Sequence, residues 1–239
     1  MAIKEVHLAP IGLAGLGGAG VLVIWAAEGL PPIGWMAALA YLVVSNALLL
    51  GALRRARTSR LGWANAVTAM RSTLVAIITG LVAASFVAPI PVPLLVGLVV
   101  SALVLDAVDG WVARRTGTMT ELGARFDMEV DAFLLLVLSA YVAPILGLWV
   151  LAIGLMRYVF VAAGWVLPRL RLRLPYRYWR KVVTAAQGIA LTLAASGLVP
   201  ELGGVVVALA LVLLLESFGR DVVWLALRTR APRVEVGAT

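Results

Sequence analysis

Long apolar runs alternate with short polar stretches along the chain, and this pattern predicts eight membrane-spanning helices. A helix of roughly 20 apolar residues crosses the hydrocarbon layer of a bilayer. In lipid, such a run must satisfy its own backbone hydrogen bonds, as a helix does. The predicted spans are residues 9–28, 32–52, 64–86, 92–113, 123–143, 145–167, 181–199 and 202–224. The sequence therefore predicts an all-α, polytopic membrane protein.

Basic residues occupy every second connection between these spans. They fall in residues 54–60, 114–125 and 169–181 and in the C-terminal tail, whereas the connections EGLPP, VAPIPVP, YVAP and SGLVPELGG hold no Lys or Arg. Because Lys and Arg collect on the cytoplasmic side of membrane proteins, we expect both termini to be cytoplasmic and the protein to lie in the cell (plasma) membrane. The net charge of +8 is then a topology signal, and we expect no nucleic-acid partner.

Composition restricts the chemistry that the chain can perform. Apolar residues make up 63% of it and the mean hydropathy is +1.04, which excludes an ordinary soluble domain. The chain has no cysteine, so thiolate ligands and thiol nucleophiles are excluded. Its single histidine, His7, lies at the N-terminal edge. A metal site in this protein would therefore use oxygen ligands.

Four aspartates, Asp106, Asp109, Asp127 and Asp131, interrupt the apolar pattern. The flanking apolar runs cross a bilayer only if their helices include these residues, and an ionised carboxylate there is costly unless it is paired. The spacings of three and four residues place each pair on one helix face. Oxygen ligands suit Mg²⁺, Mn²⁺ or Ca²⁺ rather than zinc. We expect a divalent-cation site, in which two ions would bridge a diphosphate.

Small and basic residues accompany the first pair of aspartates. Gly110 has no side chain to keep a phosphate away from the backbone. Ala113 lies one turn beyond Asp109 and is again small, while Arg114 is placed to hold an anionic group at the rim. These residues favour a phosphate-containing ligand beside the metal.

The combined pattern resembles the signature of the CDP-alcohol phosphotransferase family at all eight specified positions: Asp106, Asp109, Gly110, Ala113, Arg114, Gly123, Asp127 and Asp131. Asn65, Thr68 and Arg71 resemble a further motif of the family, in its first core helix. The resemblance covers about residues 64–224 and implies a fold of six transmembrane helices. We therefore expect an N-terminal two-helix hairpin with a basic link (1–60), a six-helix catalytic domain (61–228) and a cytoplasmic tail (229–239).

The resemblance also implies a reaction, in which an alcohol displaces CMP from a CDP-linked substrate, usually CDP-diacylglycerol. It implies that Asp106, Asp109 and Asp127 hold a pair of Mg²⁺ or Mn²⁺ ions. Asp131 would share one ion and act as the general base that accepts the proton of the acceptor hydroxyl. It further implies a homodimer in the membrane, engaged in phospholipid synthesis.

Donor binding is expected, by the same resemblance, from Gly110, Ala113, Arg114, Gly123, Asn65, Thr68 and Arg71. Gly110 would face the diphosphate and Ala113 the nucleotide. Thr68 and Arg71 have two alternative roles: they would either contact the phosphate of CMP or pack beside the aspartates.

Four residues are candidates for binding the acceptor: Arg157, Arg180, Lys181 and Gln187. Arg157 lies mid-span, so it should face the cavity, where it would bind an acceptor phosphate or neutralise the aspartates. Arg180 and Lys181 would anchor a helix end at the interface or line an entrance for anionic substrates.

Lys181, Thr184 and Gln187 resemble a pattern of phosphatidylglycerophosphate synthases, so glycerol phosphate is the preferred acceptor. Met128 and Ala132 depart from the Pro and Lys that those synthases usually carry. Phosphatidylglycerol, an inositol phosphate and serine remain alternative acceptors.

A divalent-cation transporter is the alternative of another class. It would need polar residues through the outer halves of the spans, and those halves are almost purely apolar here.

Overall fold

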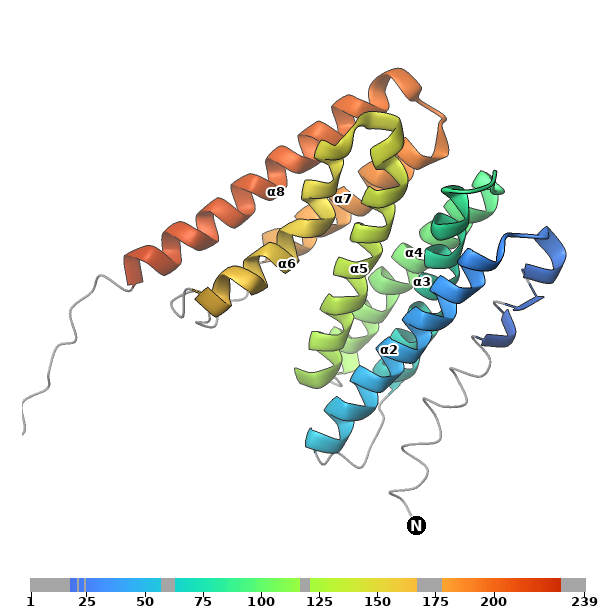
Figure 1. Cartoon of the computed structure of the whole chain (residues 1–239). Helices are drawn as coiled ribbons and strands as arrows, with labels where there is room; N and C mark the ends of the chain where they lie inside the picture. Colours follow the sequence, from blue (N-terminus) through green and yellow to red (C-terminus); the bar gives the residue numbers. More distant parts are fainter. Residues whose placement is uncertain are drawn as a thin grey trace, which may run out of the picture.

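The computed structural model describes residues 18–20, 22–23, 25–56, 63–116, 121–166 and 178–228, and within these ranges it contains helices and no strand. The elements are α2 (Pro32–Ala56), α3 (Trp63–Ser85), α4 (Val92–Thr116), α5 (Glu121–Leu146), the short 3₁₀ helix η1 (Leu148–Val150), α6 (Leu151–Val166), α7 (Tyr178–Ser196) and α8 (Pro200–Arg228) (Figure 1). The predicted all-α class is confirmed.

Five helical segments are long and apolar enough to cross a bilayer: Pro32–Gly51, Val92–Trp111, Gly123–Leu146, Leu148–Val166 and Pro200–Leu225. The chain is therefore a multi-pass membrane protein. Most of the predicted first span, residues 9–28, lies outside the described residues, as does the tail 229–239.

One of the predicted spans, α7, departs from this simple pattern, because it does not reach the hydropathy of a spanning segment. This helix begins with polar and basic residues, among them Arg180 and Lys181. Its lower hydropathy thus comes partly from the turn that carries candidate functional residues. In α3, the apolar stretch Met70–Ser85 contains Arg71 near its start.

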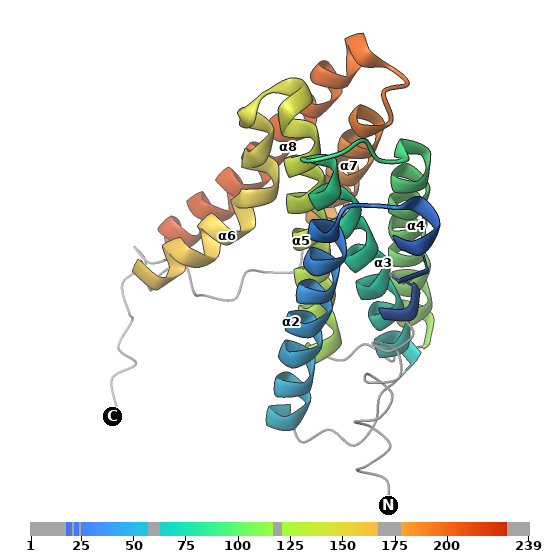
Figure 2. The same cartoon turned by 45° about the vertical axis from the view of Figure 1, so that its right-hand side comes forward.

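α5 lies in the middle of the bundle and contacts α3, α6 and α7 (Figures 1 and 2). α3 also packs against α2 and α4, and α7 packs against α4 and α8. The short connections before α2, between α3 and α4, between α5 and α6 and between α7 and α8 lie at one end, the upper end in Figure 1. These are the connections without Lys or Arg.

Glycines allow the closest approaches between helices. A Cβ atom on Gly154 of α6 would lie 2.4 Å from the Cα atom of Leu136 on α5, so only glycine fits there. A Cβ atom on Gly34 of α2 would lie 2.6 Å from the carbonyl oxygen of Gly80 on α3. Small residues commonly permit such contacts between membrane helices. They bring α6 against α5, and α2 against α3.

Candidate active site

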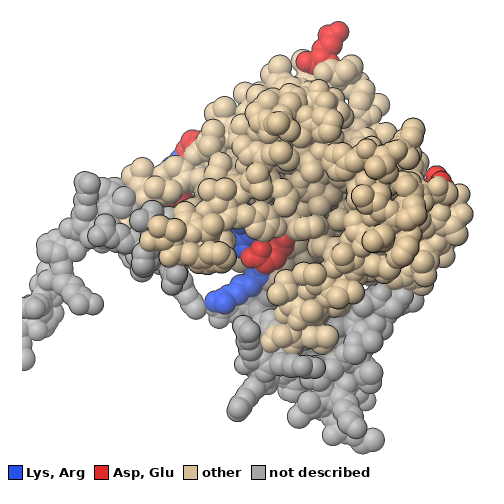
Figure 3. All heavy atoms as spheres, viewed as in Figure 1, with Lys and Arg blue, Asp and Glu red and all other residues tan. Residues whose placement is uncertain are grey.

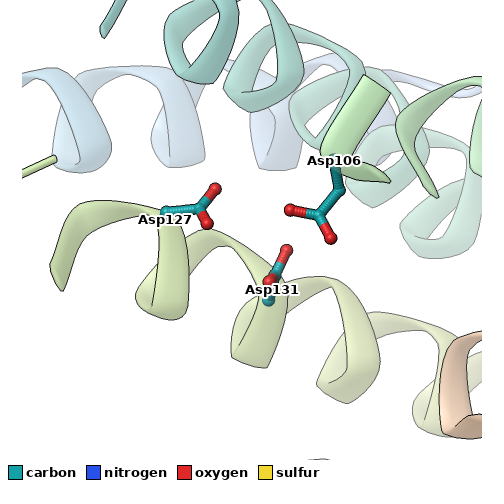
Figure 4. A group of neighbouring side chains, drawn as sticks. All are labelled: Asp106, Asp127 and Asp131. Carbon is teal, nitrogen blue, oxygen red and sulfur yellow. The ribbon is translucent and has the colours of Figure 1, made fainter. Parts of the chain in front are cut away.

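Three carboxylates converge from two helices at one point of the bundle (Figure 4). Asp106 comes from α4, and Asp127 and Asp131 come from successive turns of α5. One oxygen atom from each carboxylate lies within 4.8 Å of those of the other two. The side chains are 25–38% exposed, so they remain accessible to a ligand.

Arg71 of α3 is the cation at this point, and its side chain is only 1% exposed. Its Nη1 donates to Asp106 Oδ1 at 2.8 Å and also to Asp127 Oδ1. Its Nη2 donates to Asp131 Oδ1. The sequence left open whether Arg71 contacts the phosphate of CMP or packs beside the aspartates. In the structure, Arg71 packs beside the aspartates.

The donor set fits a divalent cation. Three carboxylates carry more negative charge than one guanidinium balances, and buried or half-buried charges of one sign need compensation. Each carboxylate uses one oxygen for Arg71 in the contacts above, which leaves its second oxygen for a ligand. Hard cations such as Mg²⁺ prefer oxygen ligands of this kind. Asp109, half-buried on the next turn of α4, lies outside the group of three.

The other residues expected to bind the donor lie on α3, α4 and α5. Gly110 on α4 and Gly123 on α5 are half-buried. The side chains of Asn65, Thr68, Ala113 and Arg114 lie outside the described residues, although their backbone belongs to α3 and α4. Their predicted contacts with the donor therefore stay predictions.

Two of the predicted acceptor residues, Lys181 and Gln187, lie on α7, which packs against α4 and α5. Lys181 is exposed and interacts electrostatically with Asp127 and Asp131. Gln187 lies near the middle of α7, is only 1% exposed, and no described residue pairs with its Nε2. Its neighbour Gly188 packs on Leu103, which lies one turn before Asp106 on α4. The first turn of α7 thus brings a cation towards the carboxylates.

Arg157 and Arg180 pair with acidic residues other than the four aspartates. Arg157 of α6 forms an ion pair with Glu129 of α5. Arg180 lies 3.0 Å from the buried carboxylate of Asp221 and so joins α7 to α8. One possibility for Arg157 was that it neutralises the aspartates. In the structure, Arg71 makes those contacts instead.

The sequence reasoning missed both acidic partners. Neither Glu129 nor Asp221 belongs to the motifs that the sequence pattern singles out. On α8 itself, Glu216 forms an ion pair with Arg220, four residues further on. The depth at which Arg157 lies in its predicted span was the available signal, because a guanidinium there needs a carboxylate on a neighbouring helix. No comparable signal marked Asp221.

Most of the described surface in Figure 3 is uncharged. Acidic and basic atoms meet in a recess in the lower half of this view, and the other charged atoms lie at its upper tip and its left and right edges. An uncharged surface of this kind is stable in contact with lipid, while the recess offers a polar environment. The molecule therefore presents a polar recess beside a broad uncharged face.

A comparison with protein families supports the same interpretation. The family model for CDP-alcohol phosphatidyltransferase matches residues 61–216, which is more than half of the chain. The chain therefore belongs to the CDP-alcohol phosphatidyltransferase family, and membership implies transfer of a phosphatidyl group from a CDP-alcohol. Neither the curated proteins nor the solved structures gave a match. The matched region includes Arg71 and all four aspartates, whereas α2 precedes it.

Proposed function

We propose that this protein transfers a phosphatidyl group from CDP-diacylglycerol to an alcohol, with release of CMP, as a step of phospholipid synthesis. One observation carries the proposal: Asp106, Asp127 and Asp131 converge within 4.8 Å, inside the region that matches the family. Bound divalent ions, Mg²⁺ or Mn²⁺, would neutralise the diphosphate and stabilise the charge on the departing CMP.

The chain's own residues divide the remaining work. The acceptor oxygen attacks the phosphorus that carries the diacylglycerol, and the bond from this phosphorus to the oxygen of CMP breaks. Asp131 takes the proton of the acceptor hydroxyl, since a general base must lie within hydrogen-bond reach of the reacting group. Arg71 holds the three carboxylates in a fixed arrangement, so little reorganisation is needed when substrate binds.

The preferred acceptor is glycerol phosphate, which would give a phosphatidylglycerophosphate-type product. Lys181 supports this assignment because an exposed ammonium that interacts electrostatically with Asp127 and Asp131 can bind an acceptor phosphate. Gln187 supports it because its buried Nε2 can donate to an acceptor oxygen. Arg157 becomes available to the acceptor only if its ion pair with Glu129 opens.

The site would face the cytoplasm of a cell whose plasma membrane holds the protein. The support is the absence of Lys and Arg from the connections at the opposite end of the bundle, together with the basic residues near the aspartates. A homodimer stays a prediction from the family resemblance.

Purified protein supplied with CDP-diacylglycerol, Mg²⁺ and a panel of alcohols tests the proposal. The panel contains glycerol 3-phosphate, phosphatidylglycerol, inositol 1-phosphate and serine, and CMP release is followed with each. We expect the fastest release with glycerol 3-phosphate. Faster release with another alcohol would reassign the acceptor, while no release with any of them would contradict the proposed reaction. Protein-dependent passage of Mn²⁺ into vesicles would favour a transporter instead.

A further inference from the structure

α2 lies before the region that matches the family, yet it packs against two of the helices that supply the candidate site. Figure 2 shows it alongside α3 and α5, which carry Arg71 and two of the aspartates. Most of α2 is apolar, but Tyr41 and Ser45 are four residues apart and so share one face of the helix.

This face of α2 is bonded to the residue that follows Arg71. Ser72 Oγ of α3 donates to the phenol oxygen of Tyr41 at 3.4 Å and lies at the same distance from Ser45 Oγ. Two other hydroxyls of α3 bond to their own helix: Thr79 donates to the carbonyl of Val75 and Ser85 to that of Val82. Ser72 therefore differs from these residues in reaching across to α2.

Tyr41 also contacts the helix that carries the proposed general base. Its ring stacks on that of Phe133, with a centroid distance of 4.7 Å and an interplanar angle of 26°. Phe133 lies two residues after Asp131 on α5. Tyr41 also interacts electrostatically with Arg71 and Asp131. Tyr41 of α2 thus contacts Ser72, the neighbour of Arg71, and Phe133, which lies two residues from Asp131.

Ring packing alone does not account for the phenol. A phenylalanine at this position would stack on Phe133 equally well, and it would spare the membrane interior a buried hydroxyl that needs a partner. That partner is Ser72, the residue adjacent to Arg71. The hydroxyl is therefore placed where it constrains the turn of α3 from which the guanidinium extends.

We propose that Tyr41 is a positioning residue of the active site, which acts through Ser72 to fix Arg71 relative to Asp131. α2 would then be part of the catalytic unit rather than an appended anchor. This inference rests on the proposed function, because its main test measures CMP release.

Tyr41→Phe in the full-length protein tests the inference, since it removes the hydroxyl and keeps the ring. We expect kcat to fall about three- to tenfold, the effect of losing one hydrogen bond that matters in the transition state. The KM for CDP-diacylglycerol should change less than twofold, and the thermal midpoint by less than about 3 °C. A purely structural role would lower the thermal midpoint and leave kcat of the folded enzyme unchanged.

Tyr141→Phe is the matched control. Tyr141 is half-buried on α5, ten residues beyond Asp131, which is about 15 Å along a helix. Tyr141→Phe also removes a phenol oxygen, but far from the site, so the kcat of this variant should equal that of wild type. Equal kcat values for Tyr41→Phe and Tyr141→Phe would overturn the proposal.

A double-mutant cycle tests the route through Ser72. If Tyr41 acts through this hydroxyl, Tyr41→Phe combined with Ser72→Ala should reduce kcat no further than the stronger single variant. Multiplied losses would show that the two residues act independently, and would overturn the proposed route.

Failure of the proposed function would be visible separately, as an absence of CMP release from wild-type protein with every acceptor. In that case a titration with Mn²⁺, with the thermal stabilisation of the protein as its readout, decides the inference. Arg71 contacts the carboxylates that would bind the ion, so a displaced Arg71 should change the affinity for Mn²⁺. Midpoints of the titration that differ threefold or more between Tyr41→Phe and wild type would support it, and equal midpoints would overturn it.

Discussion

Arg71 on α3 and Asp106 on α4 are 35 residues apart in the chain and are joined by a hydrogen bond of 2.8 Å. The same guanidinium contacts Asp127 and Asp131 on α5, so one buried cation links all three carboxylates. The aspartates alone would repel one another in a medium of low dielectric constant. Arg71 therefore allows the acidic cluster to form before a metal ion binds.

Replacing Arg71 should destabilise the protein strongly when no divalent ion is present. Arg71→Ala leaves three half-buried carboxylates without their cation, and breaking a buried pair in this way costs about 3–5 kcal/mol. We expect a large drop in the thermal midpoint in EDTA, which Mg²⁺ partly reverses because the ion supplies positive charge. Arg157→Ala is the control, since it removes a more exposed ion pair and should have a small effect on stability. Equal losses in the two variants would contradict this role for Arg71.

Asparagine variants of Asp131 and Asp106 should differ in their effects on turnover and on donor binding. Asp131→Asn removes the proposed base but keeps a polar side chain, so turnover should be lost while CDP-diacylglycerol still binds. Asp106→Asn removes a metal ligand, so both binding and turnover should weaken. Donor binding measured by isothermal titration, beside CMP release, checks both variants. Turnover at the wild-type rate in either one would rule out the role given to that residue.

The ion pair between Arg157 and Glu129 should control access of a phosphorylated acceptor to the guanidinium. If Arg157 binds the acceptor phosphate, Arg157→Ala raises the acceptor KM, whereas Glu129→Gln lowers it by releasing the arginine. The KM for CDP-diacylglycerol serves as the internal control and should stay constant. An acceptor KM that changes in neither variant would limit the pair to joining α5 and α6.

The contact of Gly154 with α5 should tolerate no side chain. Gly154→Ala places a Cβ atom 2.4 Å from Leu136 Cα, so the two helices must separate. Overpacking of this kind costs typically about 1–3 kcal/mol. Gly97→Ala on α4 is the matched control, because a Cβ atom there meets nothing within 4 Å. We expect a lower thermal midpoint only for Gly154→Ala, and equal midpoints would contradict the packing.

Much of the fold follows from local sequence. Apolar runs of spanning length predicted helices whose observed ends lie within a few residues of the expected ones, as for α4 (Val92–Thr116). The four-residue spacing predicted that Asp127 and Asp131 share a face of α5. Which cation meets them did not follow, because Arg71 and Arg157 were both candidates. That choice depends on how each helix is rotated in the bundle, and such rotation is fixed by contacts between distant residues rather than by local periodicity.

The same limit explains why two other contacts were not predicted. The pairing of Arg180 with Asp221 joins α7 to α8, and Asp221 has Arg220 beside it on its own helix, which offers a simpler pairing. The contact of Tyr41 with Ser72 joins α2 to α3, and neither residue interrupts its apolar run in the way a charge does. Polar contacts between neutral residues on different helices leave little trace in the hydropathy pattern.

The most direct test of the central claim is CMP release from CDP-diacylglycerol and glycerol 3-phosphate by purified protein, measured in Mg²⁺ and in EDTA with wild type and Asp127→Asn. We predict release by wild type in Mg²⁺, none in EDTA, recovery when Mg²⁺ is restored, and a demand for more Mg²⁺ in Asp127→Asn. Release that continues in EDTA, or an Asp127→Asn enzyme with the Mg²⁺ requirement of wild type, would contradict the claim that these carboxylates bind the catalytic ion.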